Sequence, residues 1–302
     1  MAILFLIVFV DLVGFGLLIP LLPFYVQRVG AGPELITAVL GLYSLAQFVA
    51  GPIWGRLSDK YGRKPILVIT SAGLAVSYVM LAYADSLTFL IFARIFGGIM
   101  GGNIGAAQAY IADITTPETR AKGMGMMGAA FGLGFIFGPA IGGVLGGNDV
   151  ATANFWLPAM AAAGVTAVAA VSAQLFLKES LTAEVRAKTP PKQATSVIDR
   201  LKTTFSRTTL VLLTAAGFLS VTAWAQFETI FSLWANDKFS YGPQHIGFIL
   251  AFIGVLAVIV QGGAIGKLTK KFGERKLLVV SLVPLGTSAT LQNRCQSRFA
   301  EV

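Results

Sequence analysis

The chain alternates between long apolar blocks and short polar loops. The blocks that we read as transmembrane helices are 2–26, 35–55, 65–84, 86–112, 121–147, 152–177, 208–234, 245–266 and 276–290. A helix needs about 20 predominantly apolar residues to cross the hydrocarbon core of a bilayer, and the ninth block is short by this measure. The pattern predicts an all-α integral membrane protein with about eight or nine spanning helices.

A polar stretch at 178–207 separates the blocks into two sets. It contains Pro190 and Pro191 and has seven basic residues against three acidic ones, as is typical of a linker. We therefore expect an N-terminal six-helix bundle at 1–177, the linker at 178–207, an incomplete C-terminal bundle at 208–290 and an atypical polar tail at 291–302.

The composition supports the membrane assignment. Hydrophobic residues make up 55% of the 302 residues and charged residues only 12%, whereas soluble domains carry about 25% charged residues. This excludes a soluble enzyme, a disulfide scaffold and a disordered chain. With one cysteine, Cys295, and one histidine, His245, neither an internal disulfide nor a histidine-rich metal site is expected. We expect no cofactor, no enzymatic activity and, without a Walker-type phosphate loop, no ATP-driven pumping.

The net charge of +9 would suggest nucleic acid in a soluble protein, but here the basic residues occupy alternate loops. The loops after the second, fourth, sixth and eighth blocks contain nearly all of the loop lysines and arginines, and the opposite loops contain only Arg28 and Lys238. By the positive-inside rule, the N-terminus and the linker are cytoplasmic. The partner is then the lipid bilayer, not nucleic acid.

Two basic loops share a pattern. Residues Gly55–Pro65 read GRLSDKYGRKP and residues Gly266–Lys276 read GKLTKKFGERK, at an offset of 211 residues. Two unrelated basic hairpins are the alternative, but the shared Gly-x-Leu and the second glycine seven residues later favour an internal duplication of six-helix halves. Transporters are commonly built from such repeats.

Four motifs resemble the major facilitator superfamily, and Gly55–Lys64, which we term the signature loop, resembles its signature most closely. Arg94 with Gly97, Gly101, Gly102 and Gly105 resembles the fourth-helix motif. The fifth-helix motif of proton-driven antiporters is matched by Gly125, Gly134, Gly138, Pro139, Gly142 and Gly143. Asp11 with Gly14, Pro20 and Pro23 resembles the first helix of drug:proton antiporters, including the tetracycline efflux group.

The resemblance implies a monomeric secondary transporter of the bacterial inner membrane. It would export drugs such as tetracycline, or other small amphipathic compounds, in exchange for protons by alternating access, and so confer antibiotic resistance. The family has twelve helices, whereas residues 287–302 are mostly polar, so we expect a C-terminal truncation. A solute:proton symporter and a non-transporting fragment are the alternatives.

Several residues are candidates for the proton-coupling site or the substrate cavity: Asp11, Arg94, Gln108, Gln226 and Glu228. A charged side chain costs roughly 2.5–3.5 kcal/mol or more in lipid, so the charged members should face the bundle interior. Asp11 lies about 13 Å along its helix, near the midplane. A buried carboxyl can bind and release a proton in the physiological range. Arg94 could pair with Asp11 or modulate its proton affinity; a purely structural ion pair, and an interfacial position for Glu228, are the alternatives.

The resemblance also implies a cytoplasmic gate made of Gly55, Asp59, Gly62, Arg63, Lys64, Asp113 and Arg120. In the family, the aspartate of the signature loop latches the two bundles together through charge pairing and a helix dipole. Positive-inside anchoring, for the basic residues, and ordinary helix capping are the alternatives. Thr116 and Pro117 predict the start of the fifth helix.

The glycines of the fifth block recur every four residues, at 134, 138, 142 and 146. Such a stripe lets helix backbones touch in lipid, and a second stripe runs through Gly97, Gly101 and Gly105. Gly138–Pro139 removes one backbone hydrogen bond and permits a bend. The resemblance implies that this bend seals antiporters against leak.

Overall fold

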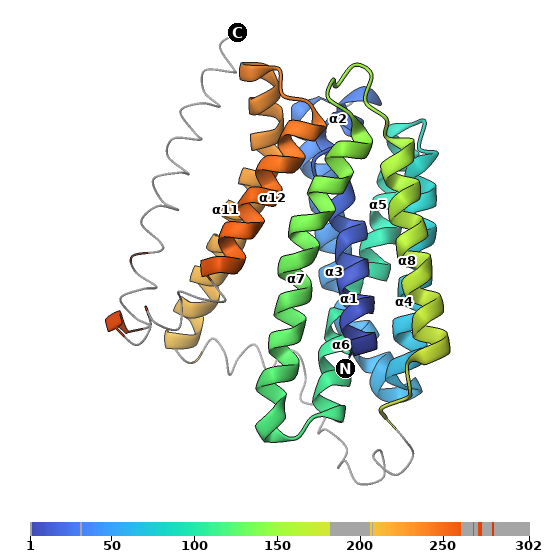
Figure 1. Cartoon of the computed structure of the whole chain (residues 1–302), viewed down its shortest axis with the longest axis vertical. Coiled ribbons are helices and arrows are strands. Elements are labelled where there is room, and N and C mark those ends of the chain that lie inside the picture. Colours follow the sequence, from blue (N-terminus) through green and yellow to red (C-terminus); the bar gives the residue numbers. More distant parts are fainter. Residues whose placement is uncertain are drawn as a thin grey trace. The chain divides into compact units, whose positions relative to one another are not determined.

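The computed structural model describes residues 2–30, 32–181, 206, 208–260, 268, 271–273 and 280 (Figure 1). Within these ranges every regular element is a helix. The chain divides into two compact units, one of Met1–Thr189 with Ser232–Val258 and one of Pro190–Phe231 with Ile259–Val302. The predicted all-α class is confirmed. The expected domain division stays a prediction, because most of the linker and of the region after 260 lies outside the described residues.

The first six predicted spans are present. The helices are α1 (Ala2–Leu18), α2 (Leu22–Arg28), α3 (Pro33–Tyr61), α4 (Arg63–Ala82), α5 (Leu87–Met100), the 3-10 turn η1 (Gly101–Asn103), α6 (Ile104–Ile114), α7 (Pro117–Gly146) and α8 (Trp156–Phe176). Among the described residues, five helical stretches are long and apolar enough to cross a membrane, and the bent pair α1–α2 makes a sixth.

Two further helices follow the linker, α11 (Thr208–Phe239) and α12 (Pro243–Ile259). They correspond to the seventh and eighth predicted spans. Their apolar parts are shorter than a full span: Leu210–Ser220 within α11, and the whole of α12. The ninth predicted span and most of the second copy of the loop repeat lie outside the described residues.

The first span is not the continuous helix that we predicted for 2–26. It breaks after Leu18, and α1 and α2 meet at 45°. Proline has no backbone N–H and disfavours helical geometry at the residue before it, so Pro20 accounts for the break between Ile19 and Leu21. The fourth span is interrupted too, because η1 joins α5 to α6 and Gly102 departs from helical geometry, with ψ at 15°.

Helix α1 lies between α7 and α8 in the first unit, as Figure 1 shows. Helix α4 packs against α8 and α5, and α3 packs against α5. The buried core is mainly apolar, whereas large apolar side chains such as Phe48, Phe92 and Phe176 are exposed. Exposed apolar side chains on all-α spans are what a lipid bilayer requires of a membrane protein.

The glycine stripe of α7 makes the close helix contact that was predicted, and its partner, which the sequence did not identify, is α1. A β-carbon added at Gly138 would lie 2.6 Å from Cα of Gly16, and one at Gly142 would overlap the carbonyl of Leu17. Another side of α7 meets α12, where Gly143 and Gly247 approach each other closely. Small residues on two faces therefore let α7 contact two helices at backbone distance.

The predicted start of α7 is also confirmed. Thr116 is its N-cap, and Thr116 and Thr119 form a reciprocal capping box with Pro117 as the first helical residue. This arrangement satisfies backbone N–H groups that have no partner within the helix.

Candidate functional site

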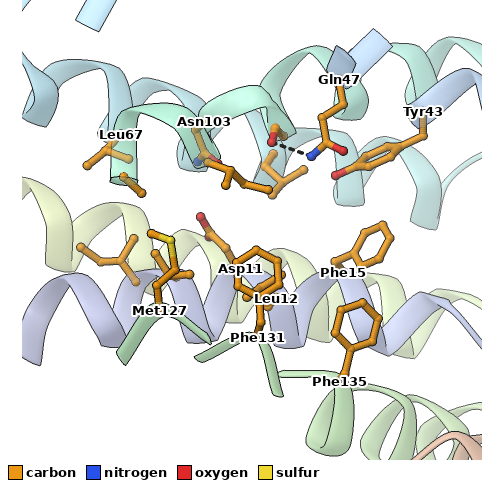
Figure 2. Close-up of a pocket in the computed structure, with 16 residues that line it drawn as sticks. Asp11, Leu12, Phe15, Tyr43, Gln47, Leu67, Asn103, Met127, Phe131 and Phe135 are labelled. Atoms are coloured by element: carbon orange, nitrogen blue, oxygen red, sulfur yellow. Dashed lines mark hydrogen bonds between the residues drawn. The ribbon is translucent and has the colours of Figure 1, made fainter. Parts of the chain in front are cut away.

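A cavity of about 150 Å³ lies inside the first unit. Residues from α1, α3, α4, η1, α6 and α7 line it, and Figure 2 shows Asp11 among aromatic and apolar side chains. Its polar lining includes Asp11, Gln47 and Asn103, and its aromatic lining is Phe15, Tyr43, Phe131 and Phe135. This Asp11 cavity therefore combines one carboxylate, two amides and several ring faces.

The Asp11 side chain has two close polar neighbours among the described residues, Ser71 and Asn103. Its Oδ2 accepts a hydrogen bond of 2.9 Å from the Ser71 hydroxyl, and its Oδ1 is buried without a partner. No described lysine or arginine forms an ion pair with it. Asp11 thus faces the bundle interior, as predicted, and its carboxyl is free of any cation that would hold it in the charged form.

Arg94 is also inside the bundle, on α5, with only 4% of its surface exposed. Its guanidinium carbon lies 4.3 Å from the centre of the Tyr43 ring, and its Nε has no hydrogen-bond partner among the residues that the structure describes. The ion pair with Asp11 that we considered is not formed within the described residues. The arginine is held instead by a cation–π contact, which is worth about 2 kcal/mol or more where water is excluded.

Tyr43 is a site residue that sequence reasoning missed. A β-carbon added at Gly101 would overlap the Tyr43 hydroxyl, and one added at Gly98 would overlap the Tyr43 backbone carbonyl. The centres of the Phe15 and Tyr43 rings lie 5.4 Å apart. It therefore fills the space left by the glycines of the fourth-helix motif. Tyr43 and Gln47 lie one turn apart in a predicted apolar span, and this polar pairing on one face was the available signal.

Three residues of the predicted gate come together at one end of the bundle. Arg63 bridges Asp59 at the end of α3 and Asp113 near the end of α6, at 2.6 and 3.1 Å. Its Nη1 also donates to the Ser58 hydroxyl at 2.6 Å. The Arg63 side chain is 6% exposed and that of Asp59 is 45% exposed. We term Asp59, Arg63 and Asp113 the Arg63 network.

The remaining gate candidates are arranged differently. Arg120 donates to the backbone carbonyl of Ala112 at 3.3 Å, and no described ion pair joins it to the Arg63 network. Lys64 contributes its backbone N–H, which Glu179 accepts at 3.1 Å. Gly55 is helical, and Gly62 has a φ of +111°.

Glu179, just after α8, was also missed by sequence reasoning. It was one acidic residue in a basic linker, and no local pattern placed it beside the signature loop.

The other cavity candidates are not in the Asp11 cavity or cannot be placed. Gln108 is exposed and does not line the cavity. Gln226 and Glu228 belong to α11, but their side chains lie outside the described residues. In the antiporter motif, Gly134, Gly138, Gly142 and Gly143 make close helix contacts, whereas Gly125 has nothing within 4 Å of an added β-carbon.

The sequence profile of the Major Facilitator Superfamily matches residues 4–291, which is nearly the whole chain. The chain belongs to the Major Facilitator Superfamily. It is therefore a multi-pass membrane transporter, and the bent first span, the signature loop and the glycine stripes are features of that transporter.

Curated relatives at about 30% identity include resistance proteins. The tetracycline resistance protein, class H, of Pasteurella multocida is 33% identical over 285 residues, which are 93% of this chain and 69% of that protein. The class G protein of Vibrio anguillarum is 33% identical over 289 residues, or 95% of this chain and 72% of that one. Multidrug resistance protein 2 of Bacillus subtilis (strain 168) is 29% identical over 278 residues, 91% and 68% of the two chains.

Solved transporters share the fold. The human organic anion transporter MFSD10 (TETRAN) matches with a TM-score of 0.64 and 26% identity, covering 87% of this chain and 71% of that one. A bacterial homologue of the lysosomal transporter Spinster, inward-facing and unoccupied, matches with a TM-score of 0.74 at 15% identity over 91% of this chain and 62% of its own length. The second likeness concerns the fold alone.

Proposed function

We propose that this transporter exports small amphipathic compounds, tetracycline among them, in exchange for protons. The observation that carries the proposal is Asp11, a carboxyl on the wall of an aromatic-lined cavity within the bundle, with no cationic partner in the described part of the chain. The names of the relatives at 29–33% identity support the choice of compounds.

The cavity offers both parts of an exchange mechanism. Its phenylalanine rings can cover the apolar body of a substrate, and Gln47 and Asn103 can hydrogen-bond a polar group. Asp11 takes up a proton from one side of the membrane and gives it up on the other. Because substrate and proton occupy the same small cavity, each can bias the equilibrium between the two access states, which requires a difference in affinity between those states.

We further propose that the Arg63 network is the cytoplasmic gate. In this arrangement the N-terminus and the linker lie in the cytoplasm of a bacterium, as the distribution of basic loops favours. The protein works as a monomer, with 1–177 as its first bundle. Reporter fusions that fluoresce only in the cytoplasm test the topology. They should fluoresce after Lys192 and stay dark after Asn148, and the reverse pattern would contradict it.

Proton release from everted membrane vesicles tests the coupling. Respiration acidifies the vesicle lumen, and a pH-sensitive dye reports protons that leave when tetracycline is added outside. Asp11→Asn should abolish this release because asparagine keeps the shape but cannot titrate. Asp85→Asn, which removes an exposed carboxylate between α4 and α5, is the matched control and should release protons normally.

Two results would overturn the proposal. Unchanged proton release from the Asp11→Asn vesicles would show that Asp11 does not carry the proton. Release that occurs only when the solute is loaded into the lumen would show symport, with solute and proton moving in the same direction.

A further inference from the structure

The first residues of the linker lie against the Arg63 network. We term Lys178–Leu181 the linker strap; it follows directly on α8, which ends at Phe176. The Tyr110 hydroxyl donates to the backbone carbonyl of Lys178 at 2.8 Å, and the Ser180 hydroxyl donates to Oδ2 of Asp113 at 3.1 Å. The strap is therefore fixed along the end of α6 at two points.

Glu179 makes the strongest attachment. Its Oε1 accepts the backbone N–H groups of Arg63 at 2.8 Å and of Leu181 at 3.0 Å, and its Oε2 accepts that of Lys64 at 3.1 Å. The first N–H groups of a helix have no partner within the helix, and its N-terminus favours negative charge. A carboxylate 115 residues away in the chain thus caps the start of α4.

Gly62 makes this close approach feasible. It is the N-cap residue of α4 and provides no side-chain cap itself. A β-carbon added at Gly62 would lie 2.9 Å from the carboxyl carbon of Glu179, and the φ of +111° is a conformation that other residues rarely adopt. Gly62, the second glycine of the signature loop, has no side chain that could cap α4. The space that its β-carbon would fill is occupied by the Glu179 carboxyl group, which caps α4 in its place.

The cap and the charge network meet in one residue. Glu179 holds the backbone of Arg63, while the side chain of Arg63 bridges Asp59 on α3 and Asp113 on α6. Asp113 is shared with Ser180 of the strap. The backbone from which the guanidinium extends, and one of the two carboxylates that it reaches, are thus both fastened to the linker.

We propose that Glu179 is a positioning residue that couples the central linker to the gate. It fastens the strap to α4, so that displacement of the linker during the transport cycle is transmitted to the Arg63 network. This inference rests on the alternating-access cycle proposed above, and it is independent of which ion drives the cycle.

Hydrogen exchange measures the cap directly. In the intact transporter in nanodiscs, the amides of Arg63 and Lys64 should be protected although they open a helix. Glu179→Gln leaves one uncharged acceptor oxygen, so these two amides should exchange about tenfold faster or more. Amides further along α4 bond within the helix and serve as the internal reference.

Transport kinetics then test the coupling in the same variant. Glu179→Gln should lower the maximal rate of tetracycline transport several-fold and leave KM unchanged, because it touches no residue of the Asp11 cavity. Glu118→Gln, the same substitution at an exposed position in the first turn of α7, should change neither quantity. Ser180→Ala should keep the amide protection because it removes only the bond to Asp113.

Unchanged protection in Glu179→Gln would show that Glu179 does not cap α4 and would overturn the proposal. Lost protection with an unchanged maximal rate, or with a change confined to KM, would leave a structural cap and overturn the coupling role. If the proposed proton antiport is wrong, the wild-type protein will transport tetracycline without releasing protons. That result would leave the amide hydrogen-exchange data unchanged.

Discussion

Gly138, at the crossing of α7 with α1, offers a direct test of the packing. A β-carbon there would lie 2.6 Å from Cα of Gly16 and 2.9 Å from its carbonyl carbon. Carbon atoms prefer separations of about 3.5–4.0 Å, so Gly138→Ala must push the two backbones apart by about 1 Å. Neither neighbour is a flexible side chain that could rotate away. The strain must therefore spread along both helices, which also touch at Gly134 and Gly142 of the stripe.

The expected cost follows from two opposing terms. Overpacking a filled core typically costs about 1–3 kcal/mol. Replacing glycine by alanine in a helix returns roughly 0.5–1 kcal/mol. Gly138→Ala should therefore destabilise the protein by up to about 2.5 kcal/mol, and by the full overpacking cost of about 1–3 kcal/mol relative to an alanine variant that keeps the helix gain. Gly125→Ala on the same helix meets nothing within 4 Å and should keep the helix gain without the cost.

Thermal unfolding of the purified variants in detergent is the assay. The midpoint of Gly138→Ala should fall below that of Gly125→Ala by about 2–12 °C, since 1 kcal/mol shifts the midpoint of a large domain by about 2–4 °C. Comparing two alanine variants of one helix removes the common change in helix propensity. Equal midpoints, or a higher one for Gly138→Ala, would refute the close α1–α7 crossing and with it the packing role assigned to the stripe.

Three smaller predictions concern single contacts. Tyr43→Phe keeps the ring over Arg94 and should leave tetracycline transport near normal, whereas Tyr43→Leu should reduce the rate about tenfold or more, which vesicle uptake measures. Gly62→Ala should lower the thermal midpoint by an amount matching about 1–3 kcal/mol of backbone strain, while Gly55→Ala, in open space, should not. Asp113→Asn should raise the exchange rate of the backbone amides around Ser180, measured by mass spectrometry, because the neutral amide is a weaker acceptor.

The spans were predictable because the bilayer imposes a simple length and polarity rule. The ends of the helices were not. We expected a span at 35–55, whereas α3 runs from Pro33 to Tyr61. Hydropathy identifies only the apolar part of a helix. Helix α3 continues past that part through the polar residues Arg56 and Asp59. The break at Pro20 was missed for a related reason, since apolar residues continue across it.

The sequence predicted which residues of the candidate site are buried, but it did not predict which side chains they contact. An ionisable residue in an apolar span must face the interior, and Asp11 and Arg94 do. Their neighbours depend on how helices distant in sequence align, which no local spacing encodes. Glu179 shows this most clearly, because it contacts the start of α4 although four α-helices, α5 to α8, separate the two in the sequence.

Asp11 and Arg94 contact different side chains, and this separation bears on the proposed mechanism of proton exchange. If Arg94 were paired with Asp11, the cation would stabilise the charged carboxylate and oppose its protonation. The Arg94 guanidinium lies instead over the Tyr43 ring. The ring has no carboxylate, so it does not compete with Asp11 for the transported proton. Among the described residues Asp11 then has two neutral neighbours, the Asn103 amide and the Ser71 hydroxyl, and the hydroxyl can donate to the charged carboxylate or accept from the protonated one. A carboxyl that can take either form in the same place is what a proton exchanger needs, so the missing ion pair favours exchange over a purely structural role for Asp11.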